Sequence, residues 1–193
     1  MQKRSENTRA RLLESALKQF GVKGYEATSV DEICAGAEVS KGAFYHHFES
    51  KQALFLYLLN SWLELIDTNL AALEKPTIPQ TLLTMTEILP SVLAAARDQL
   101  PMFLEFWLQA SRDEKVWEAS IQPYRHFRTY FSGLIERGTT EGTLSDVDPG
   151  VAGQIILSMA VGILLQALLE PQGADWERTA QQGMQILMKG LIS

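Results

Sequence analysis

Residues 39–55, VSKGAFYHHFESKQALF, bring together side chains that could do chemistry within a short span. Lys41 and Lys51 lie ten residues apart, and between them stand a glycine, a tyrosine and two adjacent histidines. A helix over this stretch places Phe44 and Phe48 on one side and Gly42 and Tyr45 on the other. The spacing therefore predicts a helix that packs through one face and offers hydrogen-bonding groups on the opposite face.

The polar face has the features that duplex DNA requires of a reading helix. Ser40 is a typical N-cap, and the first turn of a helix attracts phosphate through its N–H groups. Gly42 has no side chain to hold the backbone away from a groove wall, and Lys41 can reach a guanine edge or a phosphate. Most such contacts position the protein rather than specify the sequence. The predicted DNA-contacting residues are Ser40, Lys41, Gly42, Ala43, Tyr45, His46, His47 and, at the start of the following helix, Lys51.

Catalytic and metal-binding interpretations of these residues are weaker. His46 and His47 are adjacent, so on a helix they point about 100° apart, whereas a helix-borne zinc pair needs i, i+4 spacing. A solvated helix end is the alternative for the two histidines. The sequence shows no nucleotide-binding glycine loop and no evident triad. We therefore predict no catalytic residue, no metal site, no cofactor and no enzymatic function.

The charge distribution permits DNA binding at the N-terminal end. The chain has 193 residues and a net charge of −6. Residues 1–60 hold eight Lys/Arg and seven Asp/Glu, which leaves nine basic and sixteen acidic residues for the remainder. Such asymmetry is expected where only one end meets phosphate. The single cysteine, Cys34, and an N-terminal stretch without a secretory h-region lead us to expect a cytoplasmic protein.

The first sixty residues have the spacing of a helix-turn-helix motif. Ser29 and Glu32 form a capping box for a second helix, and a third begins at Ser40 after a turn of about four residues. Ser50 caps a long fourth helix. The first helix is predicted from apolar residues at i, i+3, i+4 and i+7, namely Leu13, Ala16, Leu17 and Phe20.

The remaining sequence keeps the helical period and shows no strand alternation, so the predicted fold class is all-α. Pro76 and Pro79 mark a linker after the fourth helix. Pro123 is expected to kink or break the helix that contains it. Further helices are predicted at roughly 81–97, 101–112, 115–138, 149–170 and 174–191.

The run VAGQIILSMAVGILLQALL (151–169) carries no charge and is long enough to cross a bilayer. Gln154 and Gln166 would be costly in lipid, and the flanks lack a Lys/Arg bias. We therefore predict no membrane contact and a helix covered by a second subunit, with a thick-cored monomer as the alternative. The predicted dimer interface comprises Ile155, Gly162, Gln166, Trp176, Gly183, Met184 and Leu187.

Aromatic residues gather between positions 101 and 131, where a small-molecule pocket is predicted. Their spacings are i, i+4 and i, i+3, i+7, which places them on common helix faces. Plain core packing is the alternative for each of them. The predicted ligand is apolar or aromatic, and the predicted lining consists of Phe103, Trp107, Tyr124, Phe127, Phe131, Met159 and Ile163.

The segment TSVDEICAGAEVSKGAFYHHFESKQALF (28–55) resembles the DNA-binding core of the TetR family of bacterial repressors. Ala37 stands where we expect the family's turn glycine, and Ala43 where the family commonly has threonine. The resemblance adds Thr28 and Ser29 to the predicted DNA contacts. The residues that match the family pattern are Thr28, Ser29, Ile33, Ala37, Val39, Ser40, Gly42, Tyr45, His47, Phe48, Ser50, Lys51 and Leu54.

The resemblance implies a homodimeric transcriptional regulator with about nine helices in each subunit. It implies a three-helix helix-turn-helix domain at 1–52 and a helical ligand-binding and dimerisation domain at 53–193. Such a regulator is most often a repressor that a small-molecule effector releases from double-stranded operator DNA. The alternative function is an all-helical protein-interaction module, which salt-dependent binding to duplex DNA would exclude.

Overall fold

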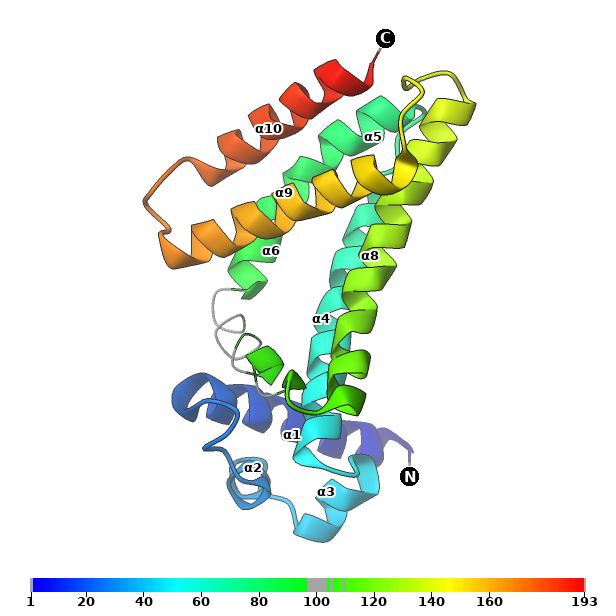
Figure 1. Cartoon of the computed structure of the whole chain (residues 1–193). Coiled ribbons are helices and arrows are strands. Elements are labelled where there is room, and N and C mark those ends of the chain that lie inside the picture. Colours follow the sequence, from blue (N-terminus) through cyan, green and yellow to red (C-terminus); the bar gives the residue numbers. More distant parts are fainter. Residues whose placement is uncertain (1, 97–103, 105, 109, 193) are drawn as a thin grey trace. The chain divides into compact units, whose positions relative to one another are not determined.

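A computed structural model describes residues 2–96, 104, 106–108 and 110–192. Within these residues all regular structure is helical (Figure 1), which confirms the all-α prediction. The elements are α1 (Gln2–Lys23), α2 (Val30–Gly36), α3 (Lys41–His47), α4 (Lys51–Ala72), α5 (Ile78–Thr84), the 3₁₀ turn η1 (Met85–Ile88), α6 (Leu89–Ala96), α8 (Glu114–Thr140), α9 (Pro149–Leu169) and α10 (Trp176–Leu191).

The chain divides into two compact units. The head unit comprises residues 1–63 and the described part of 97–120, and the body unit comprises 64–96 and 121–193. Helices α4 and α8 each have one end in the head unit and the other in the body unit. The domain boundary after residue 52 stays a prediction, since it rests on sequence resemblance alone.

In the head unit, α1 packs against α2 and α3 (Figure 1). The buried residues of α1 are Leu12, Ala16 and Phe20, at i, i+4 and i+8, whereas the predicted Leu13 and Leu17 are only half-buried. Ser15 shares the buried face and donates its hydroxyl hydrogen bond to the carbonyl of Ile33 at 2.8 Å. The buried face of α1 therefore includes a polar residue that bonds to α2, and the spacing of apolar residues alone does not predict this.

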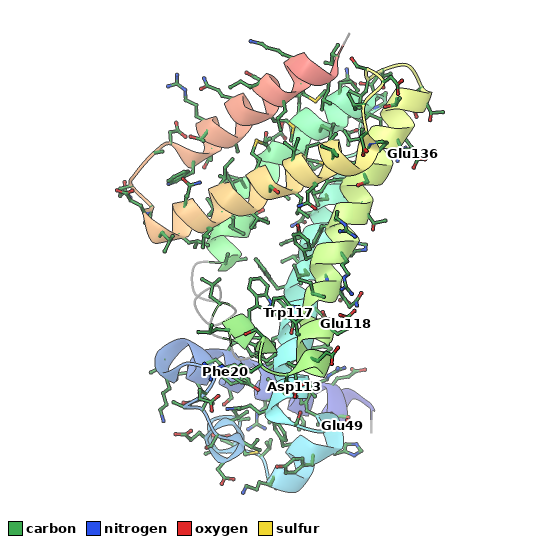
Figure 2. All side chains as sticks on the ribbon, viewed as in Figure 1. Phe20, Glu49, Asp113, Trp117, Glu118 and Glu136 are labelled. Carbon is green, nitrogen blue, oxygen red and sulfur yellow. The ribbon has the colours of Figure 1, made fainter. Side chains whose placement is uncertain are left out.

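Four aromatic rings form the centre of the head unit. Phe20, labelled in Figure 2, lies 5.5 Å from Tyr25 and 5.6 Å from Phe55 between ring centroids. Phe106 stacks on Phe55 with centroids 4.0 Å apart and meets Tyr25 edge to face at 5.1 Å. Phe106 comes from the 97–120 segment, so a residue about fifty positions after Phe55 completes the core of the head unit.

In the body unit, α10 packs on α9, and both contact the α5–α6 region. The two helices lie side by side in Figure 1. The buried residues of α10 are Ala180, Met184 and Met188, again at i, i+4 and i+8. Gly153 lets α9 approach α8 closely, because a Cβ at that position would lie 2.6 Å from the backbone nitrogen of Ser132.

Two predicted helices differ from the structure. The element predicted at 81–97 begins earlier, because Thr77 caps α5, and it is interrupted by η1. Pro123 does not break its helix: α8 continues from Glu114 to Thr140. A single proline removes only one N–H donor, which a helix of 27 residues can tolerate. Of the element predicted at 101–112, residues 104, 106–108 and 110 are helical and 111–112 form a turn, whereas Pro101 and Phe103 lie outside the described residues.

Helix α9 stands out among the described helices for its composition. Its length and mean hydropathy of 2.0 would suffice for a membrane span, although one such helix is weak support for a membrane location. Only 28% of its most apolar window is buried within the subunit. Exposed apolar residues on α9 are Val151, Ile155, Val161 and Leu169.

Candidate nucleic-acid interface

The start of α2 is fixed by the predicted capping box. The Ser29 hydroxyl accepts from the backbone N–H of Glu32 at 3.2 Å, and the Ser29 N–H donates to the Glu32 carboxylate at 2.9 Å. Lys23 of α1 also donates to this carboxylate. The Lys23 contact, and then the hydrogen bonds from Ser29, lower the pKa of Glu32 to about 2. Glu32 is therefore ionised at neutral pH and ties the α2 N-terminus to the end of α1.

The start of α3 is fixed in the same way. The Ser40 hydroxyl accepts from the backbone N–H of Ala43 at 3.2 Å, which confirms the predicted cap. Phe44 and Phe48 are buried in the head unit, as the spacing predicted. Their burial fixes the rotation of the helix, so the residues between them on the other side must face outward.

The exposed face of α3 carries four of the ten predicted DNA-contacting residues. Lys41, Gly42, Tyr45 and His46 are exposed, with Tyr45 at 55% of its full accessible surface. The Tyr45 ring meets the buried Phe44 ring edge to face, with the centroids 5.3 Å apart. The half-buried members of the predicted set on this helix are Ala43 and His47.

Gly42 is not required by the fold. A Cβ at this position would lie 3.7 Å from Ser40 Oγ, which is an ordinary contact distance. Its φ is not in the left-handed region. Because neither packing nor backbone conformation of the subunit demands glycine here, the open space above Gly42 is available to an external partner.

His47 lies at the edge of the interface. Partial burial, followed by the neighbouring His46 and by Arg9, lowers the pKa of His47. Arg9 stacks on the ring of Tyr57 at 4.0 Å and is a residue that sequence reasoning missed. At neutral pH His47 is therefore expected to act as a neutral hydrogen-bonding group.

Lys41 has an intramolecular partner that the sequence did not reveal. Its ammonium lies 2.7 Å from the carboxylate of Asp31 on α2, and both side chains are more than half exposed. An exposed pair of this kind contributes little to folding stability. It does, however, place a carboxylate beside the cation at the first position of α3.

Thr28 and Lys51 are placed differently from the other predicted contacts. Thr28 is buried and donates its hydroxyl hydrogen bond to the Gly24 carbonyl at 2.8 Å, so its position favours a role in the turn. The Lys51 ammonium donates to backbone carbonyls of the α1–α2 connection. Neither side chain shares the exposed face of α3, whereas Ser29 is exposed at the start of α2.

The turn between α2 and α3 has its strained residue one position later than we expected. Glu38 has φ of 50°, in the left-handed region, whereas Ala37 has the right-handed φ of −84° and is buried. The position that favours glycine is thus that of Glu38. Arg11 of α1 donates to the Glu38 carboxylate at 3.0 Å and contacts this turn directly.

The residues predicted to line a ligand pocket fall in both units. Trp107 belongs to the head unit, whereas the others that are described belong to the body unit. Phe127, Phe131 and Ile163 are buried there and Met159 is half-buried. Gln154 of α9 lies 2.5 Å from the Tyr124 hydroxyl, which adds a polar pair at the α8–α9 contact.

The residues predicted for the dimer interface differ in how far they are exposed on the single subunit. Ile155 and Gln166 are exposed on α9 and Gly162 is half-buried. Met184 is buried in its own subunit, because α10 uses its apolar stripe to pack on neighbouring helices. Gly183 faces Met159 within the same chain. Trp176 and Leu187 are half-buried.

Within the part of the chain that the structure describes, no group of three His, Cys, Asp or Glu residues is placed to hold a metal ion. The arrangement instead offers hydrogen-bond donors and a cation on one exposed helix face. Such groups can contact phosphates and base edges without any bond-making chemistry.

Two family descriptions match the chain. Residues 12–58 match the bacterial regulatory proteins of the tetR family, and residues 80–191 match the C-terminal part of BetI-type transcriptional repressors. The first match covers α2, α3 and most of α1, together with the start of α4. The second covers more than half of the chain and falls mainly on the body unit.

Comparisons over the full length agree with these matches. The HTH-type transcriptional regulator UidR of Escherichia coli K12 is 24% identical, with 100% of this chain and 97% of UidR aligned. A transcriptional regulator of Pseudomonas aeruginosa PAO1 has the same fold, with a TM-score of 0.79 at 23% identity over 94% of this chain and 88% of that one. A regulator of Saccharomonospora viridis, determined in complex with choline, has a TM-score of 0.77 at 19% identity over 96% and 97%.

Proposed function

The chain belongs to the TetR family of bacterial regulatory proteins, and from that premise we propose how this ligand-responsive, DNA-binding transcriptional regulator reads its operator, dimerises and is released. Membership of this family supports a DNA-binding, ligand-responsive transcriptional regulator. We propose that it forms a dimer and acts as a repressor that a small-molecule effector releases from operator DNA.

We propose that the exposed face of α3 enters the major groove of the operator. The observation that carries this proposal is the combination of Lys41, Gly42 and Tyr45 on one exposed face, opposite the buried Phe44. Lys41 is proposed to contact a base edge or phosphate, and the Tyr45 hydroxyl to donate to a phosphate. The remaining proposed contacts are Ser29, Ser40, Ala43, His46 and His47.

We propose that α9 supplies the centre of the dimer interface. Only 28% of its most apolar window is buried in the single subunit, and soluble proteins rarely leave such a surface without a partner. Ile155, Gly162 and Gln166 lie on the helix that offers this surface, and Ile186 adds an exposed apolar residue on α10. Trp176 and Leu187 are proposed for its periphery. A twofold interface would use the same surface of each subunit.

We propose that the effector is apolar or aromatic and binds in the body unit near the buried Phe127, Phe131 and Ile163. Tyr124 and Gln154 could there hydrogen-bond a polar group of the ligand. Choline, which the S. viridis regulator binds, is a small cation surrounded by methyl groups and belongs among the compounds to be tested. We further propose that the protein acts in the cytoplasm, without enzymatic activity.

The experiment that tests this function begins with selection of genomic fragments by the purified protein. The affinity for a selected fragment is measured at increasing salt concentration and then with candidate effectors. We expect the affinity to fall steeply with salt, because phosphate contacts release counterions. We also expect at least one effector to weaken binding. Salt-independent binding would contradict the DNA interface, and effectors that stabilise the protein without changing its DNA affinity would contradict the release model.

A further inference from the structure

The Lys51 side chain lies among three backbone carbonyl groups of the connection between α1 and α2. Its Nζ atom lies 2.7 Å from the backbone carbonyl oxygen of Tyr25, 2.8 Å from that of Thr28 and 3.3 Å from that of Glu26. An ammonium group has three N–H donors and no acceptor. Three converging carbonyl oxygens therefore match its full donor capacity.

The ring of Tyr25 adds a fourth contact to this site. The Lys51 ammonium lies 4.3 Å from the ring centroid, within the range of a cation–π interaction. Burial, and then the nearby Glu26, raise the pKa of Tyr25 to about 12, so the phenol stays neutral at physiological pH. The ring belongs to the central aromatic cluster through Phe20, Phe55 and Phe106. Lys51 thus contacts both the connection and the core.

The α1–α2 connection is shaped so that its carbonyl groups converge. Gly24 has a left-handed φ of 82°, which turns the chain sharply after α1. Thr28 closes the turn through its hydroxyl bond to the Gly24 carbonyl and its N–H bond to the Tyr25 carbonyl. The carbonyl groups of Tyr25, Glu26 and Thr28 lie outside any helix, and each accepts a hydrogen bond from Lys51.

The same connection leads directly into the DNA-contacting elements. The residue after Thr28 is Ser29, the N-cap of α2, and α2 packs against α3. Lys51 is itself the first residue of α4. A single ammonium therefore joins the start of α4 to the start of α2.

We infer that Lys51 is a positioning residue for DNA recognition, not a phosphate contact. It holds the α1–α2 connection against α4 and so sets the orientation in which α2 and α3 are presented. This inference rests on the proposed DNA interface and replaces our expectation that Lys51 binds the DNA backbone. This role accounts for the position of the Lys51 ammonium, which donates to backbone carbonyls of its own subunit.

The test compares Lys51→Met with Lys51→Arg in the full-length protein, using a fragment selected by the wild type. Methionine keeps the unbranched apolar stem and loses the charge. Arginine keeps the charge, but its planar fork does not match three converging carbonyls. For both variants we expect affinity to fall by roughly tenfold or more. The slope of log affinity against log salt should stay at the wild-type value.

If Lys51 instead contacts a phosphate, the two variants should behave differently. The slope of log affinity against log salt would decrease in magnitude by about 1 for Lys51→Met, and Lys51→Arg would keep the wild-type affinity. Lys41→Ala serves as the control in which a reduced slope is expected. A reduced slope for Lys51→Met, rescue by arginine, or unchanged affinity in a folded variant would each overturn the inference. Wild type that does not bind DNA would instead contradict the proposed function.

A measurement on the wild type covers the case in which the variants do not fold. Lysine acylation rates are followed by mass spectrometry without DNA and with a saturating selected fragment. We expect Lys51 to react slowly in both states, because its half-buried ammonium lies among three carbonyl oxygens. Lys41 is more than half exposed in its ion pair with Asp31, and we expect it to react faster unless DNA is bound. Rapid acylation of Lys51 that DNA suppresses would overturn the inference.

Discussion

At the scale of single residues, the head unit balances its cations with its own carboxylates. Lys41 pairs with Asp31, Lys23 with Glu32 and Arg11 with Glu38. The first pair bears on the proposed recognition, since Lys41 begins α3. If Lys41 contacts DNA as proposed, the Asp31 carboxylate competes with DNA for the ammonium and repels the phosphates around it.

We expect Asp31→Asn to bind the operator roughly two- to fivefold more tightly, the range that an exposed ion pair can contribute. The gain should be larger at low salt, where screening is weaker. Equilibrium binding to a selected fragment checks this expectation. Glu177→Gln, which makes the same charge change in the body unit, is the control. Affinity no higher than that of the control would show that Asp31 does not compete with DNA.

Local sequence signals predicted the positions that local chemistry determines. The caps at Ser29 and Ser40 were predictable because each depends on residues three positions apart. The left-handed residue of the turn was misplaced by one position, because Ala37 and Glu38 have no side-chain property that marks which of them turns. Only the backbone angles resolve this point.

At the scale of elements, a glycine determines how closely α1 and α2 pack. A Cβ at Gly36 would overlap the hydroxyl oxygen of Ser15, which is buried and bonded to the Ile33 carbonyl. Sequence reasoning attached no importance to Gly36. The contact spans about twenty residues, and neither residue belongs to an apolar stripe, so periodicity does not show it.

We expect Gly36→Ala to destabilise the protein by about 1–3 kcal/mol, the usual cost of overpacking or of a lost buried hydrogen bond. Alanine otherwise favours a helix over glycine by about 1 kcal/mol. Gly133→Ala in α8 provides the matched control, because nothing lies within 4 Å of its added Cβ. Urea unfolding of both variants measures the difference. Equal effects of the two substitutions would contradict the close α1–α2 contact.

Long-range packing was the part of the site that the sequence did not reveal. The apolar pattern gave no sign that the ring of Phe106 stacks on Phe55 in the head unit. Lys51 was predicted as a DNA contact because its position in the motif was visible and its carbonyl partners were not. Contacts of this kind depend on how distant segments meet, which a single sequence does not specify.

At the scale of the whole molecule, the proposed recognition uses two heads. A twofold dimer presents its two reading helices to half-sites roughly 34–36 Å apart, one turn of the duplex. The exposed apolar residues of α9 are proposed to hold the two subunits together. Loss of this contact should weaken operator binding even when each head is intact, because the second half-site then binds independently.

We expect Ile155→Glu to give a monomer in sedimentation equilibrium and to lose operator affinity, since a buried unpaired carboxylate is costly at an interface. Ile155 is 48% exposed in the single subunit, so the substitution should leave the fold intact. Leu65→Glu on α4 has a similar exposure of 52% and is the control. A dimer mass for Ile155→Glu would remove α9 from the centre of the interface.

The claim on which the whole account depends is that the exposed face of α3 meets DNA at close range. Gly42→Ala tests it most directly, with unfolding free energy and operator affinity measured on the same sample. The fold has room for the added methyl group, so stability should be unchanged or higher by up to about 1 kcal/mol. Operator affinity should fall by about tenfold or more, because the methyl group meets the groove. An equally stable variant with wild-type affinity would contradict the account.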